Sequence, residues 1–239
     1  MNRKPLPTAA AAIFLCAAFN AHAGNLNNLG SLSQDQYDKL SKDIGTVAAY
    51  RGITPGNSLG ITGFDIGLEV TQSKIDNPAI FKQAGGSDTS TLYVPKLHVQ
   101  KGLPLGFDIG AFVSRVPGVS ATLYGGEVRY QIIEDGLTTP SLALRASGSK
   151  LSGVSQTSLS TYGVDAILSK KLTFVTPYIG AGSVHIADKP KVGGLTEASS
   201  NQSRVFVGVN ANFLISNFAV EVERMGKVDS ISAKIGLRF

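Results

Sequence analysis

The chain ends on Asp229-Ser-Ile-Ser-Ala-Lys-Ile-Gly-Leu-Arg-Phe239, a stretch that alternates between two kinds of residue. In an extended strand, successive side chains point to opposite faces. Every second residue from Ile231 to Phe239 is apolar, and the residues between them are polar, charged or glycine. An apolar face that ends on an exposed aromatic residue suits a strand that faces lipid better than one in a soluble protein.

The same stretch resembles the closing strand of bacterial outer-membrane β-barrels. The resemblance is carried by the terminal Phe239 and by Leu237, Gly236 and Ile235 before it. It implies that these four residues form the signal that the barrel assembly machinery reads. Because many soluble strands also alternate, the rest of the chain has to support a barrel.

Residues 1–23 have the organisation of a secretory signal peptide. Arg3 and Lys4 precede an apolar run over residues 9–19, and small residues stand before Gly24. The apolar run is too short for a transmembrane helix, which needs roughly 20 residues. Cys16 lies inside this segment, and a lipoprotein signal is the less favoured alternative because Leu15 precedes it. We expect Cys16 to leave with the signal, so that the mature chain has no cysteine for disulfides or thiolate metal sites.

Composition favours a β-barrel and argues against a nucleic-acid-binding protein. The formal net charge of +5 falls to +3 once Arg3 and Lys4 are removed, and no basic run with interleaved aromatic residues occurs. The chain has 27 glycines among 239 residues, no Trp and a slightly positive mean hydropathy of +0.11. Such a profile is typical of a barrel whose apolar residues are spread over many alternating strands.

Residues 24–58 predict a polar linker followed by an amphipathic helix. Ser33 and Gln36 have the spacing of a capping box, and the helix is expected to reach about Tyr50. One apolar stripe runs along it at spacings of three and four, formed by Tyr37, Leu40, Ile44 and Val47. We expect a periplasmic helix packed against or into the mouth of the barrel. A helix that contacts a partner protein or the inner leaflet is the alternative.

Residues 59–239 divide into ten alternating segments, each long enough to cross a bilayer as a tilted strand. The predicted strands are 61–72, 91–101, 105–116, 121–132, 141–150, 160–169, 175–186, 204–214, 218–223 and 229–239. Pro95 and Pro177 fall inside two of them, where each removes a hydrogen-bond donor, so they are expected near strand ends or bulges. The prediction is an all-β, up-and-down antiparallel transmembrane barrel, with eight or twelve strands as alternatives to ten.

The connections between these segments alternate in length. Residues 102–104, 134–140, 170–173 and 215–217 form short links on one side, whereas 73–90 and 187–203 form long polar loops on the other. With both termini in the periplasm, the short turns face the periplasm and the long loops face outside. This arrangement requires an even number of strands.

Residues 59–67 and 101–110 resemble a group of uncharacterised proteobacterial outer-membrane proteins. The resemblance extends over much of the mature chain and implies an outer-membrane barrel of a Gram-negative bacterium. It implies no activity and no catalytic position.

Strand parity places charges of both signs inside the barrel. The predicted lumen charge network is Asp65, Glu69, Lys96, Asp108, Glu127, Arg129, Arg145, Asp165, Arg204, Glu221, Glu223, Lys234 and Arg238. Buried charges need partners, and barrels of eight to ten strands are narrow enough to be filled by side chains. A filled lumen is therefore the favoured interpretation, and a narrow pore or a pocket for a small solute is the alternative.

An outer-membrane enzyme is less favoured. Outside the signal segment only His98 and His185 occur, and His185 near Asp188 and Ser183 is the one combination that suggests a general base. No motif identifies Ser183 as a nucleophile, and no metal or cofactor motif is present. A soluble lipocalin-like barrel is a further rival, which would reverse the inner and outer faces.

The sequence thus predicts a small non-enzymatic outer-membrane barrel with an envelope-structural or surface-interaction role. A narrow pore or carrier for a small solute is the alternative. The expected partners are outer-membrane lipid, the barrel assembly machinery and, for the alternative function, a small solute. The oligomeric state stays open.

Overall fold

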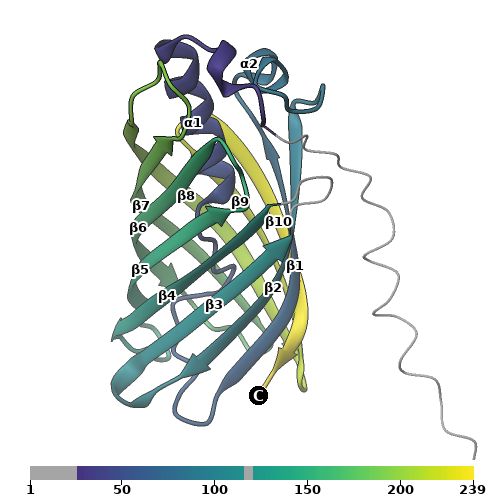
Figure 1. The fold of residues 1–239 in the computed structure, drawn as a ribbon. Helices are drawn as coiled ribbons and strands as arrows, with labels where there is room; N and C mark the ends of the chain where they lie inside the picture. Colours follow the sequence, from purple (N-terminus) through teal and green to yellow (C-terminus); the bar gives the residue numbers. More distant parts are fainter. Residues whose placement is uncertain (1–25, 116–120) are drawn as a thin grey trace, which may run out of the picture.

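The computed structural model describes residues 26–115 and 121–239, which form a closed antiparallel barrel of ten strands with a helix at one end (Figure 1). The predicted signal peptide lies outside the described residues. Neighbouring strands along the chain are neighbours in the barrel, and β10 closes the ring against β1. The strands are β1 Phe64–Lys74, β2 Thr91–Gly102, β3 Phe107–Arg115, β4 Thr122–Ile133, β5 Ser141–Ser152, β6 Thr157–Ser169, β7 Val175–Pro190, β8 Ala198–Phe213, β9 Ser216–Met225 and β10 Val228–Arg238.

The terminal stretch closes the barrel as its alternation predicts. Phe239 donates its backbone N–H to the carbonyl of Phe64 at 3.0 Å and accepts the N–H of Phe64 at 2.6 Å. Ile235 and Leu237 point outward, opposite Leu68 and Ile66 of β1. Closure gives each of the ten described strands a neighbour on both sides, as a sheet in hydrocarbon requires. Whether the last residues are read by an assembly machinery stays a prediction.

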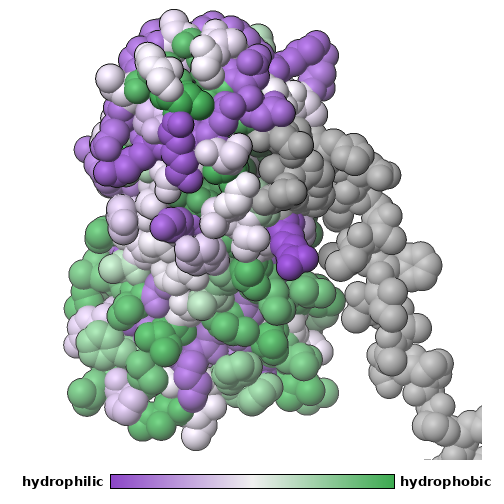
Figure 2. All heavy atoms as spheres, viewed as in Figure 1, coloured by the Kyte–Doolittle hydropathy of each residue, from purple (hydrophilic) through white to green (hydrophobic). Residues whose placement is uncertain are grey.

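Apolar side chains cover most of the outer face of the strands, and most of their charged side chains face inward. Figure 2 shows apolar side chains gathered over the lower half of the visible face and hydrophilic ones over the upper half, around the helices and loops. Val164, Ile179 and Val220 are more than half exposed, whereas Asp65 and Arg204 are buried. The lipocalin-like alternative, with an apolar interior, is therefore wrong.

The two ends of the barrel differ. The turn end carries the C-terminus and the short connections 103–106, 134–140, 170–174 and 214–215. The loop end carries the connections 75–90, 153–156, 191–197 and 226–227. The predicted loop 187–203 is mostly strand, because β7 extends to Pro190 and β8 begins at Ala198. The predicted loop 73–90 contains a short helix, α2 Pro78–Gln83.

Both prolines lie inside strands. Pro177 is the third residue of β7, close to its beginning, as expected. Pro95 lies well inside β2, opposite Val70 of β1, but β3 pairs with β2 only from Leu97 onward. The missing donor of Pro95 is tolerated because this part of β2 lies beyond the β2–β3 ladder.

Helix α1 Gln34–Ala48 begins at the predicted capping box and lies inside the barrel at the loop end (Figure 1). The Ser33 N–H bonds the Gln36 side chain at 2.9 Å, and the Gln36 N–H bonds the Ser33 hydroxyl at 3.3 Å. The turn end is the one that connection lengths assign to the periplasm. Because α1 lies at the opposite end of the barrel from the short turns, the predictions of a periplasmic α1 and of periplasmic short turns cannot both be correct.

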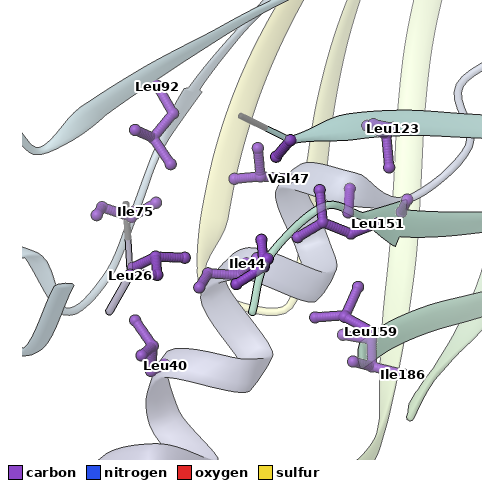
Figure 3. Close-up of a cluster of buried hydrophobic side chains, with 14 of the residues drawn as sticks. Leu26, Leu40, Ile44, Val47, Ile75, Leu92, Leu123, Leu151, Leu159 and Ile186 are labelled. Atoms are coloured by element: carbon purple, nitrogen blue, oxygen red, sulfur yellow. The ribbon is translucent and has the colours of Figure 1, made fainter. Parts of the chain in front are cut away.

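The apolar stripe of α1 packs against the inner wall. Ile44 and Val47 lie among leucines and isoleucines of the strands in Figure 3. Gly45 lets the helix approach β7, since a Cβ at this position would overlap the side chain of Ile186. No helix in the described part of the chain is long and apolar enough to span a membrane.

Candidate functional site

The lumen is occupied by the chain's own N-terminal segment, residues 26–58, which we call the plug. It begins at the loop end, where Leu26 and Leu29 are buried in one apolar cluster with Phe81 of α2. After α1, residues 49–58 run down the lumen to the turn end, and the chain then enters β1 (Figure 1). Every residue from 49 to 56 is buried.

The predicted lumen charges all come from strands around the plug. Twelve of the thirteen are buried, and the Arg238 side chain keeps 15% exposure at the turn end. Near the turn end, the Asp65 carboxylate pairs with the Lys234 ammonium at 3.0 Å and with the Arg238 guanidinium at 2.7 Å. Glu69 pairs with Lys96 at 2.5 Å.

Seven of the predicted charges form one row of alternating sign along the inner wall from β3 to β9. In order they are Asp108, Arg129, Glu127, Arg145, Asp165, Arg204 and Glu223, with successive N···O distances of 2.9, 3.9, 3.8, 2.9, 2.9 and 3.7 Å. Each internal member lies between two charges of opposite sign, which is how charges persist in a buried place.

The plug supplies a further cation at the end of this row. The guanidinium of Arg51 lies 2.8 Å from the Glu223 carboxylate and also donates to the Ser230 hydroxyl at 3.2 Å. It donates as well to the carbonyls of Thr46 and Val47, in the last turn of α1, at 3.0 and 3.2 Å. Arg51 thus caps the helix and joins it to the wall.

Arg51 also completes the charge balance. The predicted network contains seven carboxylates and six cations, and the buried Arg51 is the seventh cation facing it. Sequence reasoning misses this residue because it follows the helix without periodicity or motif. The one available signal is the excess of carboxylates over cations in the predicted lumen.

Two neighbouring plug residues make equally specific contacts. The Tyr50 hydroxyl bonds His98 Nε2 at 2.6 Å, and the Tyr50 carbonyl accepts a hydrogen bond from Arg204 at 2.6 Å. The Thr54 hydroxyl accepts one from Arg129 at 2.5 Å. Between them lies Gly52, where a Cβ would approach Arg145 to 2.6 Å and Glu127 to 2.8 Å. Glycine therefore allows the plug to cross the charged row.

The lower end of the plug is fixed by β3 and β6. Asp108 Oδ1 accepts the Leu59 N–H at 2.9 Å and the Ser58 hydroxyl at 3.2 Å. The Ser169 hydroxyl accepts the Gly56 N–H at 3.1 Å. The plug is therefore held by polar groups along its extended part and by apolar packing along α1.

At the loop end, α1 carries two buried ionisable groups. Burial raises the pKa of the Tyr37 hydroxyl, which bonds the Thr157 hydroxyl of β6 at 3.0 Å. Burial also raises the pKa of the Asp43 carboxyl, which accepts the Asn77 backbone N–H at 2.7 Å. This contact ties the connection between β1 and α2 to the helix.

The three residues that suggested catalysis are not brought together. His185 and Ser183 point outward from β7, whereas Asp188 points inward and bonds Thr157. His185 Nδ1 lies 2.9 Å from the Asn201 side-chain oxygen instead. Among residues 26–115 and 121–239, no three His, Cys, Asp or Glu residues gather as a metal site would require.

No family model matches the chain, and no curated protein matches it. The KdgM porin in complex with disordered oligogalacturonate is similar in structure, at 10% identity and a TM-score of 0.40 over 73% of this chain and 99% of that one. The translocator domain of the autotransporter NalP from Neisseria meningitidis has 9% identity and a TM-score of 0.40 over 86% and 95%. Ail of Yersinia pestis, in complex with the heparin analogue sucrose octasulfate, has 11% identity and a TM-score of 0.31 over 78% and 100%.

These likenesses concern the barrel fold alone. The resemblance of residues 59–67 and 101–110 to uncharacterised proteobacterial proteins has no family match behind it and stays a prediction.

Proposed function

We propose that this chain is an outer-membrane barrel of a Gram-negative bacterium, closed by its own plug, which acts as an envelope component or through its loop-end surface. The observation that carries the proposal is the occupied lumen inside a wall that is apolar outside. A closed barrel with this distribution of side chains satisfies its backbone in hydrocarbon and hides its charges from it.

The lengths of the connections support an orientation with the loop end outside the cell. Short turns of such barrels face the periplasm, and longer loops face outside. In this orientation α2 and the beginning of the plug lie on the outer side, and α1 enters the lumen from that side. The plug then passes inward through the lumen and reaches β1 on the periplasmic side.

The membrane location is tested by fractionation and by gel mobility. The folded barrel should sediment with the outer membrane and migrate differently on a denaturing gel before and after boiling. Recovery of the folded protein in the soluble periplasmic fraction would refute the proposed location.

The state of the lumen is tested by single-channel conductance in planar bilayers. The full-length barrel should give no discrete steps, and a variant lacking residues 26–58 should give them if it folds. Because that deletion removes many contacts, a second variant keeps the chain whole. It pairs Gly45→Cys with Ile186→Cys, two positions that face each other, so that a disulfide fixes α1 to β7.

A narrow pore with a movable plug is the second candidate function. The polar character of the contacts below α1 favours it, because these groups can bond to water in place of the plug once the segment has moved aside. A pore would give steps in the full-length protein under reducing conditions and would lose them when the engineered disulfide is oxidised. Steps that are identical in both redox states would refute closure by α1, and silence in both would support the closed barrel.

A further inference from the structure

The outer wall carries a groove of about 590 Å³ across five adjacent strands, from β7 through β8, β9 and β10 to β1. Its floor follows two neighbouring rows of outward-facing residues that the strand register aligns. The row nearer the turn end is Ile179, Val207, Val222, Ile231 and Gln72, each opposite the next on the adjacent strand. The second row contains Val205, Arg224, Asp229 and Lys74 in the same order of strands.

The groove runs obliquely between the two ends of the barrel. Ile179 lies near the beginning of β7 at the turn end, whereas Gln72 lies near the end of β1 at the loop end. With strands about 4.8 Å apart, four such steps span roughly 19 Å. This length is comparable with one leaflet of a hydrocarbon core that is about 30 Å thick.

The chemistry of the groove changes along its length. The β7–β8 end is lined by apolar side chains, and the β9–β10–β1 end adds Gln72, Lys74, Arg224 and Asp229 beside Val222 and Ile231. The guanidinium of Arg224 and the carboxylate of Asp229 neutralise each other in a two-pronged pair at 2.6 and 2.8 Å. Lys74 lies opposite Asp229 in the β1–β10 register but forms no ion pair within 4 Å among the described residues. The outward-facing side chains at this end, Lys74, Arg224 and Asp229, therefore carry one net positive charge, while Glu223 of the lining is buried on the lumen side.

We propose that this groove binds one anionic membrane lipid, with an acyl chain along the apolar rows and the phosphate of its head group at Lys74. The inference rests on the proposed membrane location of the barrel. The groove begins among apolar side chains of the outer wall, which suit an acyl chain. It ends at the Lys74 ammonium near the loop end, which suits a phosphate. The head group would lie in the leaflet at the loop end.

The test is native mass spectrometry of the purified full-length barrel with added phosphatidylglycerol or phosphatidylcholine of the same acyl chains. Phosphatidylglycerol should be retained about 2- to 5-fold more than phosphatidylcholine, the range expected for one exposed charge pair. Lys74→Gln should remove this preference. Val222→Phe, which narrows the apolar floor, should lower the retention of both lipids.

Matched controls lie on other strands. Lys150→Gln removes an exposed lysine near the loop end of β5, and Val164→Phe enlarges an exposed valine of β6. Neither should change lipid retention. Equal retention of the two lipids by the wild type, or equal losses in the controls, would overturn the lipid site. A heat-dependent gel shift in every variant separates that outcome from failure of the membrane barrel itself.

Discussion

Replacing Arg51 by Met should release the plug from the wall of the barrel. The substitution keeps an unbranched apolar stem but removes the cation that faces Glu223 and the donors to the last turn of α1. Removing one partner of a buried ion pair costs about 3–5 kcal/mol. Here the Glu223 carboxylate would keep only the more distant Arg204 guanidinium, at 3.7 Å. Since about 1.4 kcal/mol is a factor of ten, the plug should open on the order of a hundred- to several-thousand-fold more often.

Hydrogen–deuterium exchange of the α1 backbone amides measures this opening directly. In Arg51→Met their exchange should accelerate by that factor, while the central amides of β4 to β7 stay at wild-type rates. Adding Glu223→Gln should recover part of the loss, because the orphaned carboxylate is then neutral. Lys39→Met is the control, since its pair with Asp35 is largely exposed and such pairs contribute about 0.3–0.5 kcal/mol.

Two results would refute the reasoning. Unchanged exchange of α1 in Arg51→Met would mean that the plug does not depend on the pair with Glu223. Equal acceleration in α1 and in the strands would mean that the plug and the barrel open as one unit. In that case the lumen could not be unblocked without unfolding the wall.

Three further changes probe single contacts. Tyr50→Phe leaves His98 Nε2 without its partner and should destabilise the plug by about 1–3 kcal/mol. The measurement is faster hydrogen exchange of the α1 amides, and unchanged exchange would contradict this. Gly45→Leu improves helix propensity but drives a side chain into Ile186, so the α1 amides should lose protection from hydrogen exchange. A gain in that protection would show that α1 is not docked against β7. Deletion of Phe239 removes two backbone hydrogen bonds that close the barrel and should lower the yield of heat-modifiable protein, whereas an undiminished yield would argue against its role in closure.

The sequence alone determined which side chains of the barrel wall share a face. Alternation with period two puts Ile235 and Leu237 on one face and Lys234 on the other without knowledge of their neighbours, whereas the count of ten strands and the outward direction of the apolar face came from the tertiary structure. The capping box at Ser33 likewise depends on contacts three residues apart. Strand ends were less certain where the pattern fades. The first part of β8, residues 198–203, is largely polar on both faces, and only its pairing with β7 shows that it is strand.

The contents of the lumen were decided by the tertiary structure. Arg51 and Glu223 are 172 residues apart, and no local pattern relates them. The path of α1 into the loop end likewise depends on the space left inside ten tilted strands and on the surplus carboxylate that their inner faces present. Periodicity specifies the direction of a side chain, whereas the partner of a buried charge depends on which distant segment can reach it once the barrel has closed.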